Sequence, residues 1–171
     1  MNEPAIEVSL IRTRDALAEA LAVRRVVFIE GQHVPESEEI DAHDGDPVVV
    51  TSAVHVLARR AGRAVGTGRL LLDYPRGEHA HIGRVAVLEA ERRHGVGRAV
   101  MRALEAEARA RGFAGITLAA QLHAVPFYLA LGYVLAEAER GAVFLDAGIE
   151  HRWMDLDFGP RESSTPRPGA S

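Results

Sequence analysis

A short loop that combines arginines with glycines could bind a phosphate group. It consists of Arg92, Arg93, His94, Gly95, Val96, Gly97 and Arg98. The loop follows an apolar run of strand type at residues 84–88, and a helical pattern continues from it until Gly112. Glycine lets the backbone approach a ligand closely, and the first turn of a helix carries free N–H groups at the positive end of the helix dipole. This order predicts a site for a phosphate or pyrophosphate, and the alternative is a tight turn with solvated arginines.

Two other phosphate-binding loops do not match the chain. A Walker loop requires the pattern Gly-x-x-x-x-Gly-Lys-Ser/Thr, which the sequence lacks. A Rossmann loop requires three glycines in the pattern Gly-x-Gly-x-x-Gly, and only Gly95 and Gly97 are present. The predicted anion site is therefore of another class.

A second group of reactive side chains lies upstream and contains Glu39, Asp41, Asp44, His33 and His43. Its segment is broken by prolines and glycines and is predicted as a loop. The carboxylates lack the spacing of a calcium loop, and the histidines are not placed as a helical pair. We therefore expect a solvated or ion-paired loop and no metal site. The carboxylates could also attract a cationic amine substrate.

Arg24 falls on the apolar face of a predicted helix, together with Leu17, Ala20 and Phe28. One interpretation is an arginine whose charged end reaches solvent at the end of that helix. The other is an inward arginine that binds a carboxylate of the acidic loop or shapes a substrate site. The pattern leaves both interpretations open.

The elements that must position these groups alternate between strand and helix. Before the arginine loop, the sequence predicts a strand at 6–10, a helix from Thr13 or Asp15, a loop, and strands at 48–58 and 64–72 around a turn at 59–63. After the strand and helix that flank the arginine loop, it predicts a strand at 115–121, a short helix at 124–131, and strands at 133–138, 142–145 and 152–158. Gly66 and Gly68 indicate a bulge or a close backbone approach. This order predicts an α/β fold with a mixed sheet and helices on both faces.

Composition sets the broad class. A chain of 171 residues with 47% hydrophobic residues suits one domain, which we place at residues 1–158, followed by a disordered tail at 159–171 that is rich in Pro, Ser and Arg. The net charge of −4 argues against nucleic acid as a partner. The absence of cysteine excludes disulfides and a cysteine nucleophile. The sequence shows neither a membrane span nor a signal peptide, so we expect a cytoplasmic protein.

Two stretches resemble one enzyme family. The pattern Arg92-x-x-Gly95-x-Gly97 resembles the acyl-CoA loop Arg/Gln-x-x-Gly-x-Gly/Ala of the GCN5-related N-acetyltransferases (GNATs). Residues 124–133, AVPFYLALGY, are similar to the Ala-x-x-Phe-Tyr-x-x-x-Gly-Phe/Tyr segment of that family. The tyrosine of this segment, here Tyr128, often protonates the leaving thiolate. The predicted element order is also that of the GNAT fold.

Further motifs are similar to the ElaA/YjcF-like branch of the family. They are Arg24-x-x-Val27-Phe28, Gln32-x-Val34-Pro35, Glu39-x-Asp41-x-x-Asp44, Ala120-Gln121 and Gly148-Ile149-Glu150-His151-x-x-Met154. The chain departs from the branch pattern at two places, where Gly31 and Asp146 stand in positions that usually hold Glu. These departures concern the acceptor site, whereas the acyl-CoA loop is intact.

The resemblance implies a donor, an acceptor class and a set of contacts. Acetyl-CoA would bind the loop at 92–98, and its amide-bearing pantetheine arm would pair with the strand edge where the central strand splays from residues 116–121. A primary amine of a small molecule or peptide would accept the acetyl group directly, in a ternary complex. The implied donor contacts beyond the loop are Val85, Ala86, Val87 and Gln121, and the implied acceptor contacts are Arg24, Phe28, Gln32, Asp41 and Arg69. A backbone N–H near Val87 could polarise the thioester oxygen.

The general base is less defined than the acid. Many GNATs use a Glu on or near the central strand, but Arg84 stands on that strand here. His81, His123 and His151 are the candidates because imidazole titrates near neutral pH, and His151 ranks first as part of the branch motif. An amine that arrives deprotonated would need no base.

Two other functions remain open at this stage. The chain could be an acyl-CoA-binding sensor with little turnover, against which Tyr128 argues. It could also be similar to acyl-homoserine-lactone synthases, which share the fold and have a comparable early Arg-x-x-x-Phe, but whose acyl-CoA loop is normally degenerate. A homodimer is open too, because exposed sheet edges of this fold often dimerise.

Overall fold

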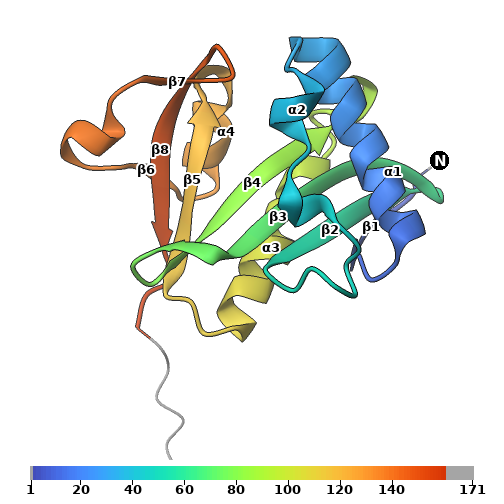
Figure 1. The fold of residues 1–171 in the computed structure, drawn as a ribbon, viewed down its shortest axis with the longest axis horizontal. Coiled ribbons are helices and arrows are strands. Elements are labelled where there is room, and N and C mark those ends of the chain that lie inside the picture. Colours follow the sequence, from blue (N-terminus) through green and yellow to red (C-terminus); the bar gives the residue numbers. More distant parts are fainter. Residues whose placement is uncertain (1, 161–171) are drawn as a thin grey trace, which may run out of the picture.

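A mixed sheet of eight strands forms the centre of the molecule in the computed structural model (Figure 1). The structure describes residues 2–160, and of Tyr74 and Pro75 it describes only the backbone. The strand order is β1-β2-β3-β4-β5-β8-β6, and β7 pairs with β8. The strands are β1 Ile6–Leu10, β2 Ala53–Arg60, β3 Arg63–Arg76, β4 His79–Val87, β5 Gly115–Gln121, β6 Val134–Leu135, β7 Phe144–Asp146 and β8 Ile149–Asp157. The predicted α/β class and mixed sheet are confirmed, whereas the predicted tail lies almost wholly outside the described residues.

Helices cover both faces of the sheet, as the element order predicted. They are α1 Arg14–Arg24, extended by a π-helical turn Arg25–Glu30, then α2 Glu36–Glu39, α3 Val96–Ala110 and α4 Val125–Ala130. Leu57 on β2 packs against α1, whereas its neighbours Val56 and Ala58 belong to the core cluster that includes α3. Because neighbouring strand residues point to opposite faces, α1 and α3 lie on opposite sides of the sheet (Figure 1).

The two glycines of β3 let α3 pack closely on the sheet. A Cβ atom at Gly68 would lie 2.8 Å from Leu104 and 2.9 Å from Val100, both on α3. The pairing of β2 with β3 shifts register between Ala58 and Arg59, which leaves one extra residue on β3 beside Gly66. The pairing of β3 with β4 also shifts register between Thr67 and Arg69, which leaves one extra residue on β4. The predicted close approach and bulge are therefore both confirmed.

Several predicted boundaries are wrong. The strand predicted from residue 48 begins at Ala53, because Asp46 caps a turn there by accepting from the Val48 N–H at 3.0 Å. Four residues of the predicted acidic loop form α2, with Pro35 preceding the first turn. The last strand begins at Ile149 rather than at residue 152, since β7 and β8 form a tight hairpin around Ala147 and Gly148, both with positive φ.

The sheet opens in its middle. Parallel pairing of β4 with β5 covers only His79 with Gly115, Ala80 with Ile116 and His81 with Thr117. Beyond these pairs the two strands diverge, as Figure 1 shows toward the top of the view. The predicted splay of the central strand is therefore confirmed. No helix of the described part of the chain is both long and apolar enough to cross a membrane.

Candidate active site

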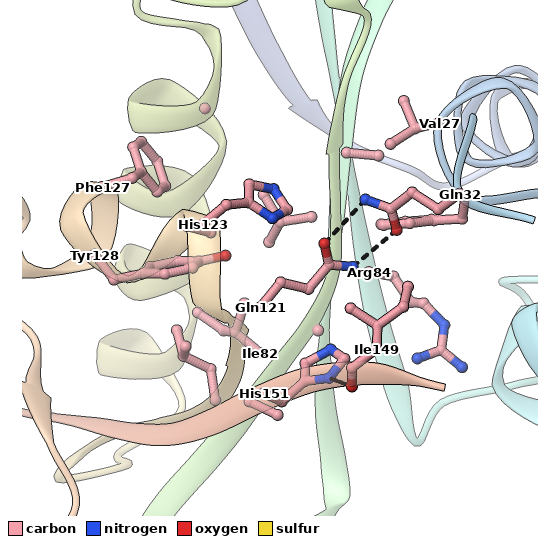
Figure 2. Close-up of a pocket in the computed structure, with 18 of the residues that line it drawn as sticks. Val27, Gln32, Ile82, Arg84, Gln121, His123, Phe127, Tyr128, Ile149 and His151 are labelled. Atoms are coloured by element: carbon pink, nitrogen blue, oxygen red, sulfur yellow. Dashed lines mark hydrogen bonds between the residues drawn. The ribbon is translucent and has the colours of Figure 1, made fainter. Parts of the chain in front are cut away.

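A cleft of about 610 Å³ fills the opening between β4 and β5. Its floor comes from the diverging halves of these strands, and its walls come from the α1–α2 segment on one side and from α4 and the β7–β8 hairpin on the other (Figures 1 and 2). The arginine loop closes one end. Residues from both ends of the chain thus meet around one cavity.

The arginine loop presents free cations and free backbone donors to the cleft. Arg92, Arg93 and Arg98 line it, are exposed, and form no ion pair within residues 2–160, and Arg92 Nε donates to the Val87 carbonyl oxygen at 3.2 Å. Gly95 turns the chain into α3 with a φ of +86°, and no side chain caps that helix. The N–H groups of the first turn are therefore left for a ligand, as expected of an anion site.

Two residues of the loop do not line the cleft. Val96 is 1% exposed and packs in the core, where it lies against Gly66. His94 is exposed, and its carbonyl oxygen accepts a hydrogen bond from Arg60 at 3.3 Å. Neither side chain is among those that line the cavity, so any contact of Val96 or His94 with a donor is through the backbone.

Arg84 bridges the bulged part of β4 to the acidic loop. Its φ of +55° is uncommon for a residue with a side chain. Its guanidinium donates to the carbonyl oxygens of Glu38 at 3.1 Å and Glu39 at 3.2 Å, and it lies 3.3 Å from the Glu39 carboxylate. Such conformations persist only where the surroundings hold them, and here the acidic loop does so. The backbone of Val85, Ala86 and Val87, which follows, lines the cleft.

A buried cluster of ion pairs lies behind the acidic loop. Arg24 is 1% exposed and contacts Glu39 at 2.7 Å and Asp44 at 2.6 Å. Arg69 contacts Asp41 at 2.7 Å and Asp44 at 3.2 Å. Burial alone would raise the pKa of Asp41 and of Asp44, but their hydrogen bonds to the arginines outweigh it and lower both pKa values. The inward interpretation of Arg24 and the ion-paired interpretation of the loop are thus confirmed.

Three of the five residues expected to contact the acceptor do not line the cleft. Arg24 and Arg69 are buried in the ion-pair cluster, and Arg69 holds Asp41 at its exposed edge. Each carboxylate there faces an arginine, so the cluster has no spare charge with which to attract an amine. Phe28 and Gln32 do line the cleft.

An amide pair crosses the middle of the cleft (Figure 2). Gln32 donates to Gln121 at 2.9 Å, and Gln121 donates back at 2.8 Å. Each side chain keeps a second N–H and a second lone pair beyond this exchange. The pair joins the segment after α1 to the end of β5 at the point where the sheet is open.

Tyr128 points its hydroxyl into the cleft beside His123 (Figure 2). Its ring is held by edge contacts with Phe127 at 5.0 Å and Tyr133 at 5.7 Å. The residue is 8% exposed, and its hydroxyl forms no hydrogen bond with any described residue. Burial raises the pKa of Tyr128, so the hydroxyl keeps its proton at neutral pH and can donate it.

The three candidate bases all line the cleft but differ in what holds them. His151 Nδ1 lies 2.7 Å from the Ile149 carbonyl oxygen and must donate to it, which leaves Nε2 as the acceptor of a neutral ring. Burial and the charges of Arg69 and Arg84 lower the pKa of His81 to about 4, which makes it a weak base. The first rank of His151 therefore has geometric support.

Comparison with known proteins agrees with this geometry. The model of the acetyltransferase (GNAT) family matches residues 18–133. This chain belongs to the GNAT family. It is 38% identical over 149 residues to the N-acetyltransferase YjcF of Bacillus subtilis, covering 86% of this chain and 97% of YjcF. The predicted ElaA/YjcF-like branch is thus confirmed.

Solved structures support the same assignment. Escherichia coli ElaA superposes with a TM-score of 0.73 at 26% identity, covering 90% of this chain and 100% of ElaA. An acyl-CoA N-acyltransferase from Pseudomonas aeruginosa superposes with a TM-score of 0.70 at 29% identity, covering 88% of this chain and 99% of the other. This GNAT protein is accordingly an acyltransferase, and the predicted enzyme class is confirmed.

Sequence reasoning missed part of the wall of this GNAT cleft. Phe144 and Trp153 line it from the β7–β8 hairpin, on which Asp146, already noted in the branch motif, also lines the cleft. Phe144 stacks on Trp153 with ring centres 5.5 Å apart and on His151 at 5.7 Å. The wrong start predicted for the last strand concealed the hairpin that brings these groups together.

Proposed function

We propose that this acetyltransferase moves an acetyl group from acetyl-CoA to a primary amine of a small molecule or peptide within a ternary complex. The observation that carries the proposal is the single cleft that joins unpaired arginines at the start of α3 to the Tyr128 hydroxyl and His151. An anion site, a protonated acid and an available lone pair in one cavity are what acyl transfer from a CoA thioester to an amine requires.

The donor would lie across the arginine loop and along β4. Its pyrophosphate would accept from the free N–H groups of the first turn of α3 and from Arg92, Arg93 and Arg98. Its pantetheine amides would use strand groups at Val85, Ala86 and Val87 that β5 leaves unpaired. An N–H near Val87 would polarise the thioester oxygen.

The transfer step then needs two proton movements. The neutral amine attacks the thioester carbon, and the tetrahedral intermediate collapses with loss of the CoA thiolate. His151 Nε2 would accept the proton that the nitrogen loses, and Tyr128 would give its proton to the thiolate. The products are an acetamide and free CoA, and the protons on both residues are restored through solvent.

Calorimetry with acetyl-CoA tests the donor site. Gly97→Glu places a carboxylate at the expected pyrophosphate and a Cβ atom 3.1 Å from the Phe127 ring. We expect affinity to fall by at least about 100-fold, because close like charges cost several kcal/mol and Phe127 must shift. Ala106→Glu adds the same charge to an exposed face of α3 and serves as the control. A folded wild-type protein that does not bind acetyl-CoA would contradict the proposal, and turnover with S-adenosylmethionine would then indicate a synthase.

Turnover separates an enzyme from a sensor and tests the acid. Tyr128→Phe keeps the ring contacts and removes the proton, so kcat should fall about 100-fold while the KM for acetyl-CoA stays close to that of the wild type. The measurement is CoA release with a panel of amines, and His151→Gln tests the base in the same assay. Binding without turnover on any amine would mean a sensor, and an unchanged kcat in Tyr128→Phe would remove this residue as the acid.

A further inference from the structure

The two ends of the cleft carry opposite charges. Arg92, Arg93 and Arg98 make the donor end basic. At the other end Arg84 is the arginine that lines the cavity, and it is engaged by Glu39 and, at 3.7 Å, by Asp41. The acceptor end therefore presents no free arginine among the lining residues.

Two carboxylates of the acceptor end remain without a cation. Glu38 and Asp146 both line the cleft and are exposed. Neither forms an ion pair with any residue that the structure describes, in contrast to Glu39, Asp41 and Asp44. An uncompensated pair of carboxylates at one end of a cavity favours a positively charged ligand.

These two carboxylates come from opposite walls. Glu38 lies on α2, and Asp146 ends β7, and Figure 1 shows these elements on either side of the opening. Asp146 pairs with Ile149 across a two-residue turn, so a short hairpin fixes its place. The two carboxylates therefore flank the cleft from opposite walls.

Two buried polar groups indicate a ligand in the same cleft, and one of them, His151, lies on the hairpin that carries Asp146. Tyr128 and His151 are each 8% exposed, and neither the Tyr128 hydroxyl nor His151 Nε2 has a partner within residues 2–160. Both groups face the cavity (Figure 2). Phe144 and Ile149, which also line it, lie on the hairpin that carries Asp146 and offer an apolar wall to a carbon chain.

We propose that the acceptor is an amine with a second, distal positive charge, held by Glu38 and Asp146 while the first nitrogen reacts. The inference rests on the proposed acetyl transfer and names the acceptor class of that site. A diamine or a peptide with a basic side chain has this chemistry. One nitrogen loses a proton and gains the acetyl group, and the distal ammonium stays charged throughout.

Matched acceptors test this inference. Cadaverine, pentylamine and aminopentanol share a carbon chain and differ in the distal group, which is an ammonium, a methyl or a hydroxyl. We expect kcat/KM for cadaverine, corrected for its two nitrogens, to exceed that for pentylamine by about tenfold, as two exposed ion pairs would give. The preference should weaken in high salt, because the carboxylates are exposed.

Variants locate the source of the preference. Glu38→Gln and Asp146→Asn should each reduce the ratio of cadaverine to pentylamine by about threefold, and the double variant should abolish it. Glu150→Gln removes an exposed carboxylate of the same hairpin that does not line the cleft, so it should keep the ratio.

The outcomes separate the two proposals. One outcome is a wild-type enzyme that binds acetyl-CoA but uses pentylamine or aminopentanol as well as cadaverine, or acetylates none of the three. Either result overturns the inference that a distal charge is recognised and leaves the donor site intact. A double variant that keeps the preference overturns the role of these carboxylates. Failure of the wild-type protein to bind acetyl-CoA overturns the acetyl transfer on which the inference rests.

Discussion

The arginines of the buried ion-pair cluster and those of the arginine loop at residues 92–98 lie in opposite surroundings. Arg24 is 1% exposed and lies within 3 Å of two carboxylates. Arg92, Arg93 and Arg98 are exposed and have no ion-pair partner in the described part of the chain. Carboxylates of the protein neutralise the charge of Arg24. The three exposed arginines have no such carboxylate, so their charge is available to an anionic ligand. Compensation by carboxylates distant in sequence therefore distinguishes Arg24 from the arginines that we propose bind the donor.

The largest expected effect is a loss of stability when an arginine of the buried ion-pair cluster is removed. Arg24→Ala leaves Glu39 and Asp44 buried beside a vacated space, and we expect the free energy of unfolding to fall by about 3–5 kcal/mol. Urea unfolding of the variant and the wild type measures this difference.

The arginine loop supplies the matched control for Arg24. Arg98→Ala removes an exposed, unpaired arginine, so its free energy of unfolding should stay within about 0.5 kcal/mol of the wild type, while the KM for acetyl-CoA rises. Equal loss of stability in both variants would contradict the distinction between the two kinds of arginine.

Much of the difference between the two regions could not be predicted from the sequence. The arginine loop is local, because strand, glycines and helix follow one another within residues 84–110, and its place between strand and helix could be predicted from their order. Arg24 and Arg69 meet Asp44 only through the tertiary fold, so periodicity left Arg24 between two interpretations. The Gln32–Gln121 pair joins residues 89 positions apart and has no local signal.

The sequence failed to predict the β7–β8 hairpin for a different reason. The position of Asp146 depends on a hairpin whose turn contains Ala147 with a φ of +49°, a conformation that alanine rarely adopts. Turn chemistry favours Asn or Asp before glycine at such places, so the turn signal was weak. The fold accommodates Ala147 in this turn although alanine disfavours it. The predicted start of the last strand was therefore three residues too late.

A smaller effect should appear in the pH dependence of stability, through His81 beside Arg69 and Arg84. Burial, then the charges of Arg69 and Arg84, lower the pKa of His81 from 6.5 to about 4. The unfolded chain thus binds this proton below pH 6.5, whereas the folded protein binds it only near pH 4. Stability is therefore fully present above pH 6.5 and falls as the pH drops toward 4, by about 3 kcal/mol from this residue.

Unfolding measured from pH 7 to pH 4 checks this dependence. His81→Gln should flatten part of the fall, and His55, whose pKa burial also lowers, should supply part of what remains. His94→Gln changes an exposed histidine of the arginine loop and serves as the control. An unchanged slope in His81→Gln would mean that neither burial nor the charges of Arg69 and Arg84 lower the pKa of His81.

The short parallel pairing of β4 with β5 means that the sheet is incomplete in the free protein. An exposed strand edge usually invites association with another chain, but here the unpaired edge lies inside a cleft. A donor that pairs with this edge would complete the sheet, so binding and the last part of folding would be one event. Ligand present at a hundred times its Kd would add about 2.7 kcal/mol to the free energy of unfolding. The stability of the free chain would then understate that of the enzyme at work.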